Sequence, residues 1–90
     1  MLLKITIEFW KEGSIFVACC PEIDMVAQGY SLEEAKKNLL EVIEIQFEEM
    51  KEMGTLEGFL KDMGFDSRGE ILESSREIVG FDKSFVKVNI

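Results

Sequence analysis

The chain has 90 residues, of which 47 % are apolar, so we expect one packed domain, and wholesale disorder is excluded. Ten Lys and Arg residues against eighteen Asp and Glu residues give a net charge of −8. Nucleic acids and anionic membranes attract basic side chains, so this charge argues against direct binding to either. It favours a basic protein partner, or it serves only to keep a small domain soluble.

Three strands are predicted in the first third of the sequence. Apolar and polar side chains alternate over residues 3–9, which indicates a half-buried strand. A polar turn over residues 11–14 follows, and the continuous apolar run 15–20 predicts a more central strand. A short third strand over residues 25–27 ends at Gly29, so the three strands are expected to form an antiparallel meander.

A long amphipathic helix over residues 31–53 is the most clearly marked element. Ser31 and Glu34 have the spacing of a capping box, and Gly54 is a typical helix terminator. The predicted apolar face consists of Leu32, Ala35, Leu39, Val42, Ile43, Phe47 and Met50. The helix also contains seven Glu residues against three Lys residues, which indicates either a solvated face or a docking surface.

The remainder of the sequence predicts a shorter helix and a final strand. Thr55 is expected to cap the helix, which is predicted over residues 56–63 and to end at Gly64. Residues 65–82 are interpreted as mainly extended, and the alternation in residues 86–90 predicts a closing strand. We expect this strand to pair in parallel with the first one, because a helical crossover returns the chain in that direction.

Together these elements predict an α+β fold in which one long helix packs on one face of a three-stranded antiparallel meander, joined by a C-terminal strand. We expect a single domain over residues 1–90, in which residues 55–82 form a helical insert and a linker. The strand 15–20 is apolar on both faces, so the sheet face without a helix would expose an apolar patch. A homodimer, a higher homo-oligomer or a protein partner would cover this patch.

The sequence offers few groups for catalysis or metal binding. It contains no histidine, which excludes catalytic triads and histidine-ligated metals. Cys19 and Cys20 would point to opposite faces of a strand. We therefore expect them to be small apolar side chains of the core that form no disulfide and no zinc site. We therefore predict no catalytic, metal-binding or cofactor-binding residues and no cofactor. No signal peptide or membrane span is evident, which favours the cytoplasm.

The segment CPEIDMVAQGYSLEEAKKNLLEVIE, residues 20–44, carries a family resemblance. The matching positions are Pro21, Glu22, Ile23, Gln28, Gly29, Ser31, Glu33, Glu34, Ala35, Asn38 and Ile43. At these positions, and in the strand pattern of residues 1–54, the chain resembles the HicB-like antitoxin family. Family members often have Gly-Gly in the first turn, where this chain has Gly13-Ser14.

The resemblance implies a β-β-β-α-β domain, similar to a degraded ribonuclease H fold, that acts by binding. Such a protein would neutralise a small, basic, RNA-cleaving toxin of the HicA type by covering its active surface. A DNA-binding segment of the kind that fuller members carry is not recognised in residues 55–90. The candidate partner-binding residues are Trp10, as an amphipathic anchor, and the acidic Glu22 and Asp24 after the second strand.

Two other functions compete with the antitoxin interpretation. An enzyme of the ribonuclease H type would need converging carboxylates for magnesium, but the predicted strand 86–90 has no acid to complete Glu8, Glu22 and Asp24. A homo-oligomeric structural or regulatory protein without a toxin would instead cover the apolar sheet face by self-association alone. We predict a binding protein and not an enzyme, since the sequence lacks a set of groups for bond breaking.

Overall fold

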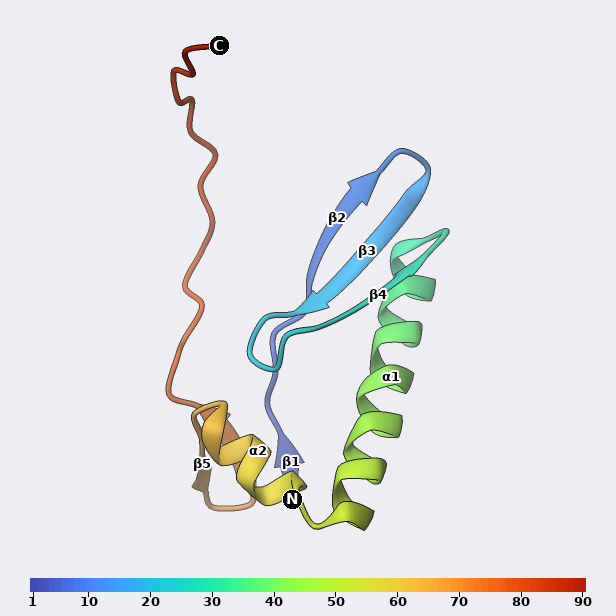
Figure 1. The fold of residues 1–90 in the computed structure, drawn as a ribbon, viewed down its shortest axis with the longest axis vertical. Helices are drawn as coiled ribbons and strands as arrows, with labels where there is room; N and C mark the ends of the chain where they lie inside the picture. Colours follow the sequence, from blue (N-terminus) through green and yellow to red (C-terminus); the bar gives the residue numbers. More distant parts are fainter.

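The structure is a computed structural model that describes residues 1–90. Its elements are β1 (Leu2–Leu3), β2 (Glu8–Glu12), β3 (Ile15–Cys20), β4 (Met25–Gly29), α1 (Leu32–Met53), α2 (Leu56–Asp62), β5 (Phe65–Arg68) and β6 (Ile71–Ser74). The α+β class, with a three-stranded antiparallel sheet and one long helix, is confirmed. Figure 1 shows α1 along one side of the larger sheet and α2 beside the smaller one.

The larger sheet has the strand order β2–β3–β4 and is antiparallel throughout. Ala18 in β3 lies opposite Phe9 in β2 and Ala27 in β4. Residues that lie opposite one another in an antiparallel pair share a face of the sheet. Ala18 belongs to the core against α1, so this is the helix-covered face. Val17 and its partner Trp10 therefore lie on the opposite face, which no helix covers.

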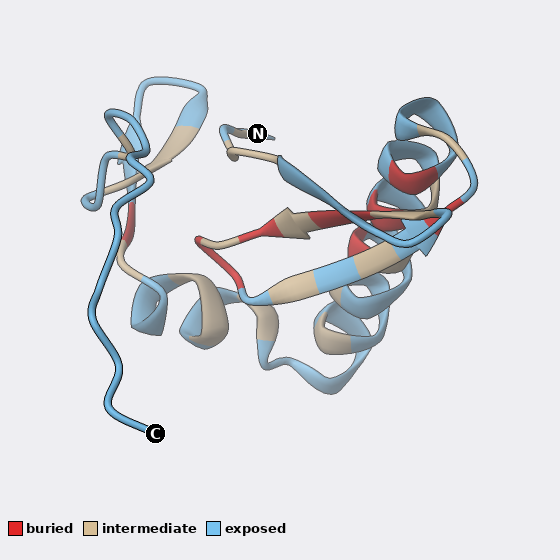
Figure 2. Ribbon diagram, turned by 90° about the horizontal axis from the view of Figure 1, so that it is seen from above, coloured by how far each residue is buried: buried red, intermediate tan, exposed pale blue.

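The core lies between the larger sheet and α1 and is also reached from the smaller sheet (Figure 2). Its buried members are Ala18, Cys20, Ile23, Ala35, Leu39, Ile43 and Phe65. Ala35, Leu39 and Ile43 recur every four residues along α1, so they form one stripe that packs on the sheet. Phe65 comes from β5, which ties the second sheet to the same core.

The ends of α1 agree with the prediction made from the sequence. The Ser31 hydroxyl accepts a hydrogen bond of 3.0 Å from the Glu34 backbone N–H. The Glu34 carboxylate accepts one of 3.3 Å from the Tyr30 backbone N–H, one residue earlier than in a standard capping box. Gly54 ends the helix with a left-handed backbone (φ 74°), a conformation that glycine adopts without steric cost.

The predicted first strand, residues 3–9, is divided between the two sheets. Leu2 and Leu3 form β1 and pair with β6, whereas residues 8–12 form β2 and pair with β3. The intervening residues cross from one sheet to the other. The polar turn is also shorter than the predicted range 11–14, because Lys11 and Glu12 continue the ladder with β3.

The prediction of a closing strand at residues 86–90 is wrong. β6 takes that place and pairs in parallel with β1, with Leu2 opposite Ile71 and Leu3 opposite Leu72. A hairpin with β5, turned at Gly69 (φ 68°), delivers β6 to this position. The β5–β6 hairpin itself closes at a low entropic cost, because only two residues separate its strands. Residues 75–90 form neither helix nor strand.

Candidate protein-binding surface

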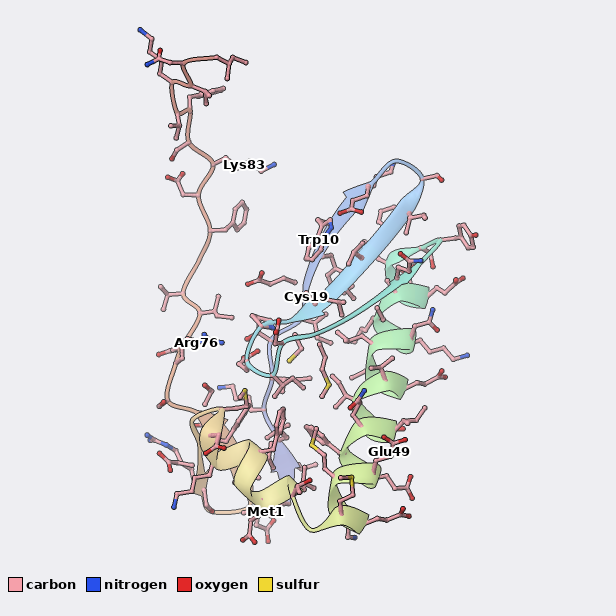
Figure 3. The ribbon with its side chains drawn as sticks, in the orientation of Figure 1. Met1, Trp10, Cys19, Glu49, Arg76 and Lys83 are labelled. Atoms are coloured by element: carbon pink, nitrogen blue, oxygen red, sulfur yellow. The ribbon has the colours of Figure 1, made fainter.

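The exposed side of α1 carries the largest concentration of acidic side chains in the molecule. Its exposed acidic residues are Glu33, Glu34, Glu41, Glu44, Glu48, Glu49 and Glu52. Glu44, Glu48 and Glu52 follow one another at intervals of four, so they form a row on one face of the helix. Figure 3 shows carboxylate-tipped side chains along the side of α1 that is turned away from the sheet.

No ion pair within the chain neutralises this row. The two ion pairs of the structure join Glu73 to Lys4 and to Arg68, both at 3.6 Å, and neither involves α1. Like charges four residues apart on a helix repel by about 0.2–0.5 kcal/mol per pair. Basic groups supplied from outside the chain would therefore find an unpaired row of carboxylates on α1.

An apolar side chain lies within the acidic surface. Ile45 is 59 % exposed, and three of its four helical neighbours at intervals of three and four are glutamates, Glu41, Glu48 and Glu49, whereas the fourth is the half-buried Val42. An apolar centre with a charged rim is typical of protein interfaces. Ile45 was not among the contact residues predicted from the sequence, although an isoleucine outside the apolar stripe of α1 is a signal that the sequence contains.

Trp10 lies where a partner could reach it. The side chain is 43 % exposed and stands on the uncovered face of the sheet, as Figure 3 shows. Its indole N–H donates a hydrogen bond of 2.9 Å to Glu12 Oε1. This bond satisfies the only polar atom of the side chain and leaves the ring available for apolar contact.

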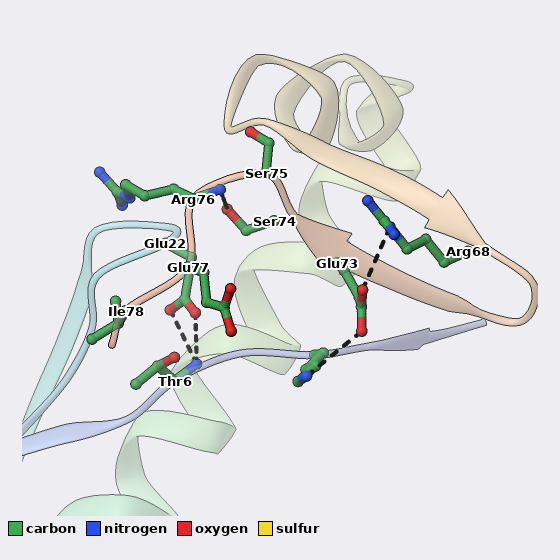
Figure 4. Close-up of a pocket in the computed structure, with 10 residues that line it drawn as sticks. Thr6, Glu22, Arg68, Glu73, Ser74, Ser75, Arg76, Glu77 and Ile78 are labelled. Carbon is green, nitrogen blue, oxygen red and sulfur yellow. Dashed lines mark hydrogen bonds and ion pairs between the residues drawn. The ribbon is translucent and has the colours of Figure 1, made fainter. Parts of the chain in front are cut away.

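Glu22 is buried and is 6 % exposed. Both carboxylate oxygens accept from the Thr6 backbone N–H, at 3.0 and 2.9 Å (Figure 4). The Cys20 thiol also donates to Oε1, at 3.6 Å. Burial raises the pKa of Glu22, but the hydrogen bonds from Thr6 and Cys20 outweigh it, so the pKa lies below its ordinary value. Glu22 thus takes the place of a sheet partner where the chain crosses between sheets, and its contact with a protein partner stays a prediction.

Asp24 is exposed in the turn between β3 and β4. Its backbone is left-handed (φ 54°), and it is the only non-glycine residue with a positive φ. This conformation directs the chain back into β4 after Pro21. Of the three predicted contact residues, Trp10 and Asp24 are therefore exposed and Glu22 is not.

The two cysteines point to opposite faces, as predicted. Cys20 is fully buried against α1, and burial, followed by the charge of Glu22, raises its pKa to about 11. Cys19 is half-buried on the uncovered face, and burial together with the charges of Glu8, Asp24 and Glu22 raises its pKa. No group of three or more His, Cys, Asp or Glu residues is arranged to hold a metal ion.

A cavity of about 370 Å³ lies beside Glu22, between the two sheets (Figure 4). Its charged lining residues are Lys4, Glu22, Arg68, Glu73, Arg76 and Glu77. Three of these side chains are basic and three are acidic, so the cavity has no net charge that would select an anion or a cation. The geometry gives it no preference for a phosphate or metal ligand.

Several residues that carry the family resemblance serve the fold. Asn38 donates a hydrogen bond of 2.9 Å from Nδ2 to the Gln28 carbonyl oxygen, which ties α1 to β4. Ser31 caps α1, and Gly29 lies against the first turn of the helix, where a side chain would not fit. These positions therefore stabilise the junction between β4 and α1. Most of the exposed glutamates of α1 are not among them.

Comparisons with protein-family models, with curated proteins and with solved structures found no significant match to this chain. No helix of the structure combines the length and the apolar character needed to cross a membrane.

Proposed function

We propose that the chain is an antitoxin-type binding protein that holds a small, basic, RNA-cleaving toxin of the HicA type and covers its active surface. The observation that carries this proposal is the row of exposed, unpaired glutamates on α1, with Ile45 among them. An RNA-cleaving protein must attract phosphates, so its active surface is basic and complements this row. The proposed place of action is the cytoplasm, and the chain itself carries out no catalysis.

The test first asks whether a neighbouring reading frame encodes a small basic protein. We expect this protein to arrest cell growth when expressed alone, and co-expression of the acidic chain to restore growth. Binding of the two purified proteins should weaken as salt is raised, because ions screen the attraction between the exposed charges. Absence of a bound basic protein, or growth arrest that the chain does not relieve, would refute the proposal.

Two variants with the same change in net charge locate the contact. Glu44→Lys with Glu48→Lys reverses the row on α1, and Glu57→Lys with Glu70→Lys reverses two exposed charges elsewhere. We expect the α1 variant to raise the Kd at low salt by about a hundredfold, since close charge pairs in interfaces couple strongly. The matched control should change it by less than about fivefold, through the long-range field alone. Equal effects would exclude α1 as the contact surface.

A further inference from the structure

The last twelve residues, 79–90, form an extended segment that we call the C-terminal arm. All twelve are exposed, and none of their backbone groups makes a hydrogen bond within the chain. Six large apolar side chains of the arm, each at least 69 % exposed, are Val79, Phe81, Phe85, Val86, Val88 and Ile90. Soluble proteins rarely leave so many apolar side chains on an unpaired, extended segment uncovered.

The residues just before the arm are fixed to the body of the protein. The Ser75 backbone N–H donates to the Gly64 carbonyl oxygen at 2.8 Å, and Arg76 Nη2 donates to the Pro21 carbonyl oxygen at 2.7 Å. Beyond this point the arm runs away from β6 along the long axis of the molecule (Figure 1). The arm is therefore presented from a defined position.

A free strand edge of matching pattern lies on β2. The order β2–β3–β4 leaves β2 at the edge of the larger sheet, and all five of its residues are exposed. Glu8, Trp10 and Glu12 stand on the uncovered face of the sheet, so an aromatic ring lies between two carboxylates. The arm has the complementary pattern at the same spacing, with Phe85 between two lysines.

We propose that the arm of one copy pairs as an antiparallel strand with β2 of a second copy, and that the second copy returns its own arm to the first. The register consists of three opposite pairs on the uncovered face: Lys87 with Glu8, Phe85 with Trp10, and Lys83 with Glu12. Each pair joins opposite charges or two aromatic rings, and both kinds stabilise neighbouring strands.

The same register matches the other face of the sheet. It places Val86 opposite Phe9 and Val88 opposite Ile7. Phe9 is 40 % exposed on the face that α1 covers, and Ile7 packs at the margin of the core. The arm would therefore extend the core of the second copy at the edge of its sheet, and its free backbone groups would gain ladder partners.

The direction of the arm favours a second copy over the same chain. The arm and β2 both run toward the same end of the long axis in Figure 1, so pairing within one chain would be parallel. A parallel register that keeps Phe85 opposite Trp10 places Val86 opposite Lys11, which loses the apolar match. A second copy related by a two-fold axis supplies the reversed direction and makes the exchange of arms mutual.

The first test measures the mass of the purified full chain by light scattering at micromolar concentration. We expect a dimer of about twice 10.3 kDa. Phe85→Asp should raise the dimer Kd by about a hundredfold, the effect of losing a central aromatic anchor. Phe85 is fully exposed within one chain, so the variant should keep its fold and circular dichroism spectrum. Val79→Asp is the matched control, because Val79 lies beyond the register and should change the Kd by less than about threefold.

The second test exchanges one charge pair. Lys87→Glu and Glu8→Lys should each raise the dimer Kd by about tenfold, and the combination should restore it to within about threefold. Rescue of Lys87→Glu by Glu12→Lys instead of Glu8→Lys would indicate the parallel register and overturn the proposal. A monomer at all concentrations would overturn it as well.

The third test separates exchange between copies from docking within one chain. A zero-length carbodiimide joins Lys87 to Glu8 only where they form an ion pair, and mixing ¹⁵N-labelled with unlabelled chain shows by mass which copies are joined. We expect linked peptides that combine one labelled and one unlabelled partner. Linkage confined to single chains would overturn the proposal. All three tests use the purified chain alone, so their outcome does not depend on a toxin partner.

Discussion

Substitution of Gly29 by alanine tests the junction between β4 and α1. A Cβ atom at this buried position would lie 2.7 Å from the Ala35 backbone nitrogen and 3.0 Å from the Glu34 carbonyl carbon. Because these are backbone atoms, no side-chain rotation relieves the overlap, and the start of α1 must move away from the sheet. Overpacking costs about 1–3 kcal/mol, and we expect the upper part of this range. For a domain of this size such a loss lowers Tm by about 10–20 °C.

The matched control for this prediction is Gly58→Ala in α2. A Cβ atom at Gly58 would have no heavy atom within 4 Å, and alanine favours the helix over glycine by about 1 kcal/mol. Thermal unfolding followed by circular dichroism should therefore show a lower Tm for Gly29→Ala and an unchanged or higher Tm for Gly58→Ala. A Tm for Gly29→Ala within about 2 °C of the original chain would refute the close approach of β4 to α1.

Three further predictions concern the β3–β4 turn and its neighbours. Glu22→Gln should lower the free energy of unfolding in urea by about 1–3 kcal/mol, because the Thr6 N–H loses a charged acceptor. The pKa of Glu22 is lowered on folding, so its contribution to the free energy of unfolding is present above the ordinary value of 4.5 and is lost as pH falls through the folded pKa. If the free energy of unfolding of Glu22→Gln fell with acid as steeply as that of the original chain, this reasoning would be contradicted. Asp24→Gly should raise the free energy of unfolding by about 0.5–1 kcal/mol by removing a left-handed non-glycine residue, and a loss of stability would count against it. A thiol reagent should label Cys19 before Cys20, whose pKa is raised to about 11 by burial. Equal labelling rates of the two thiols in the folded protein would contradict the assignment of Cys20 to the face of the sheet that α1 covers.

Local signals in the sequence were sufficient for most of the larger sheet and for α1. The run Ile15–Cys20, the cap at Ser31 and the terminator Gly54 each depend on neighbours within a few residues, and the structure has all three. The division of the first strand could not be predicted in this way. It depends on the position of β6 and on Glu22, which are far from β1 and β2 along the chain.

The final strand was misplaced for a similar reason. Residues 86–90 have a clear alternation of apolar and polar side chains, and alternation indicates the ability to pair but not the partner. The weaker pattern of β6 takes the position beside β1, since the hairpin with β5 brings it there. The burial of Glu22 could not be predicted from the sequence either, because it depends on the distant Thr6, and the contact of Glu22 with a partner stays a prediction.

The position of Phe65 has a consequence for how the chain unfolds. This ring is contributed by the smaller sheet but is 5 % exposed within the core that α1 and the larger sheet share. Removing a buried phenylalanine ring costs about 3–5 kcal/mol, out of a total stability that for small domains is about 5–15 kcal/mol. A fragment that ends after α1 would lose this contact entirely and leave a gap beneath the helix. The two sheets should therefore melt as one cooperative unit, with a single transition by every spectroscopic probe.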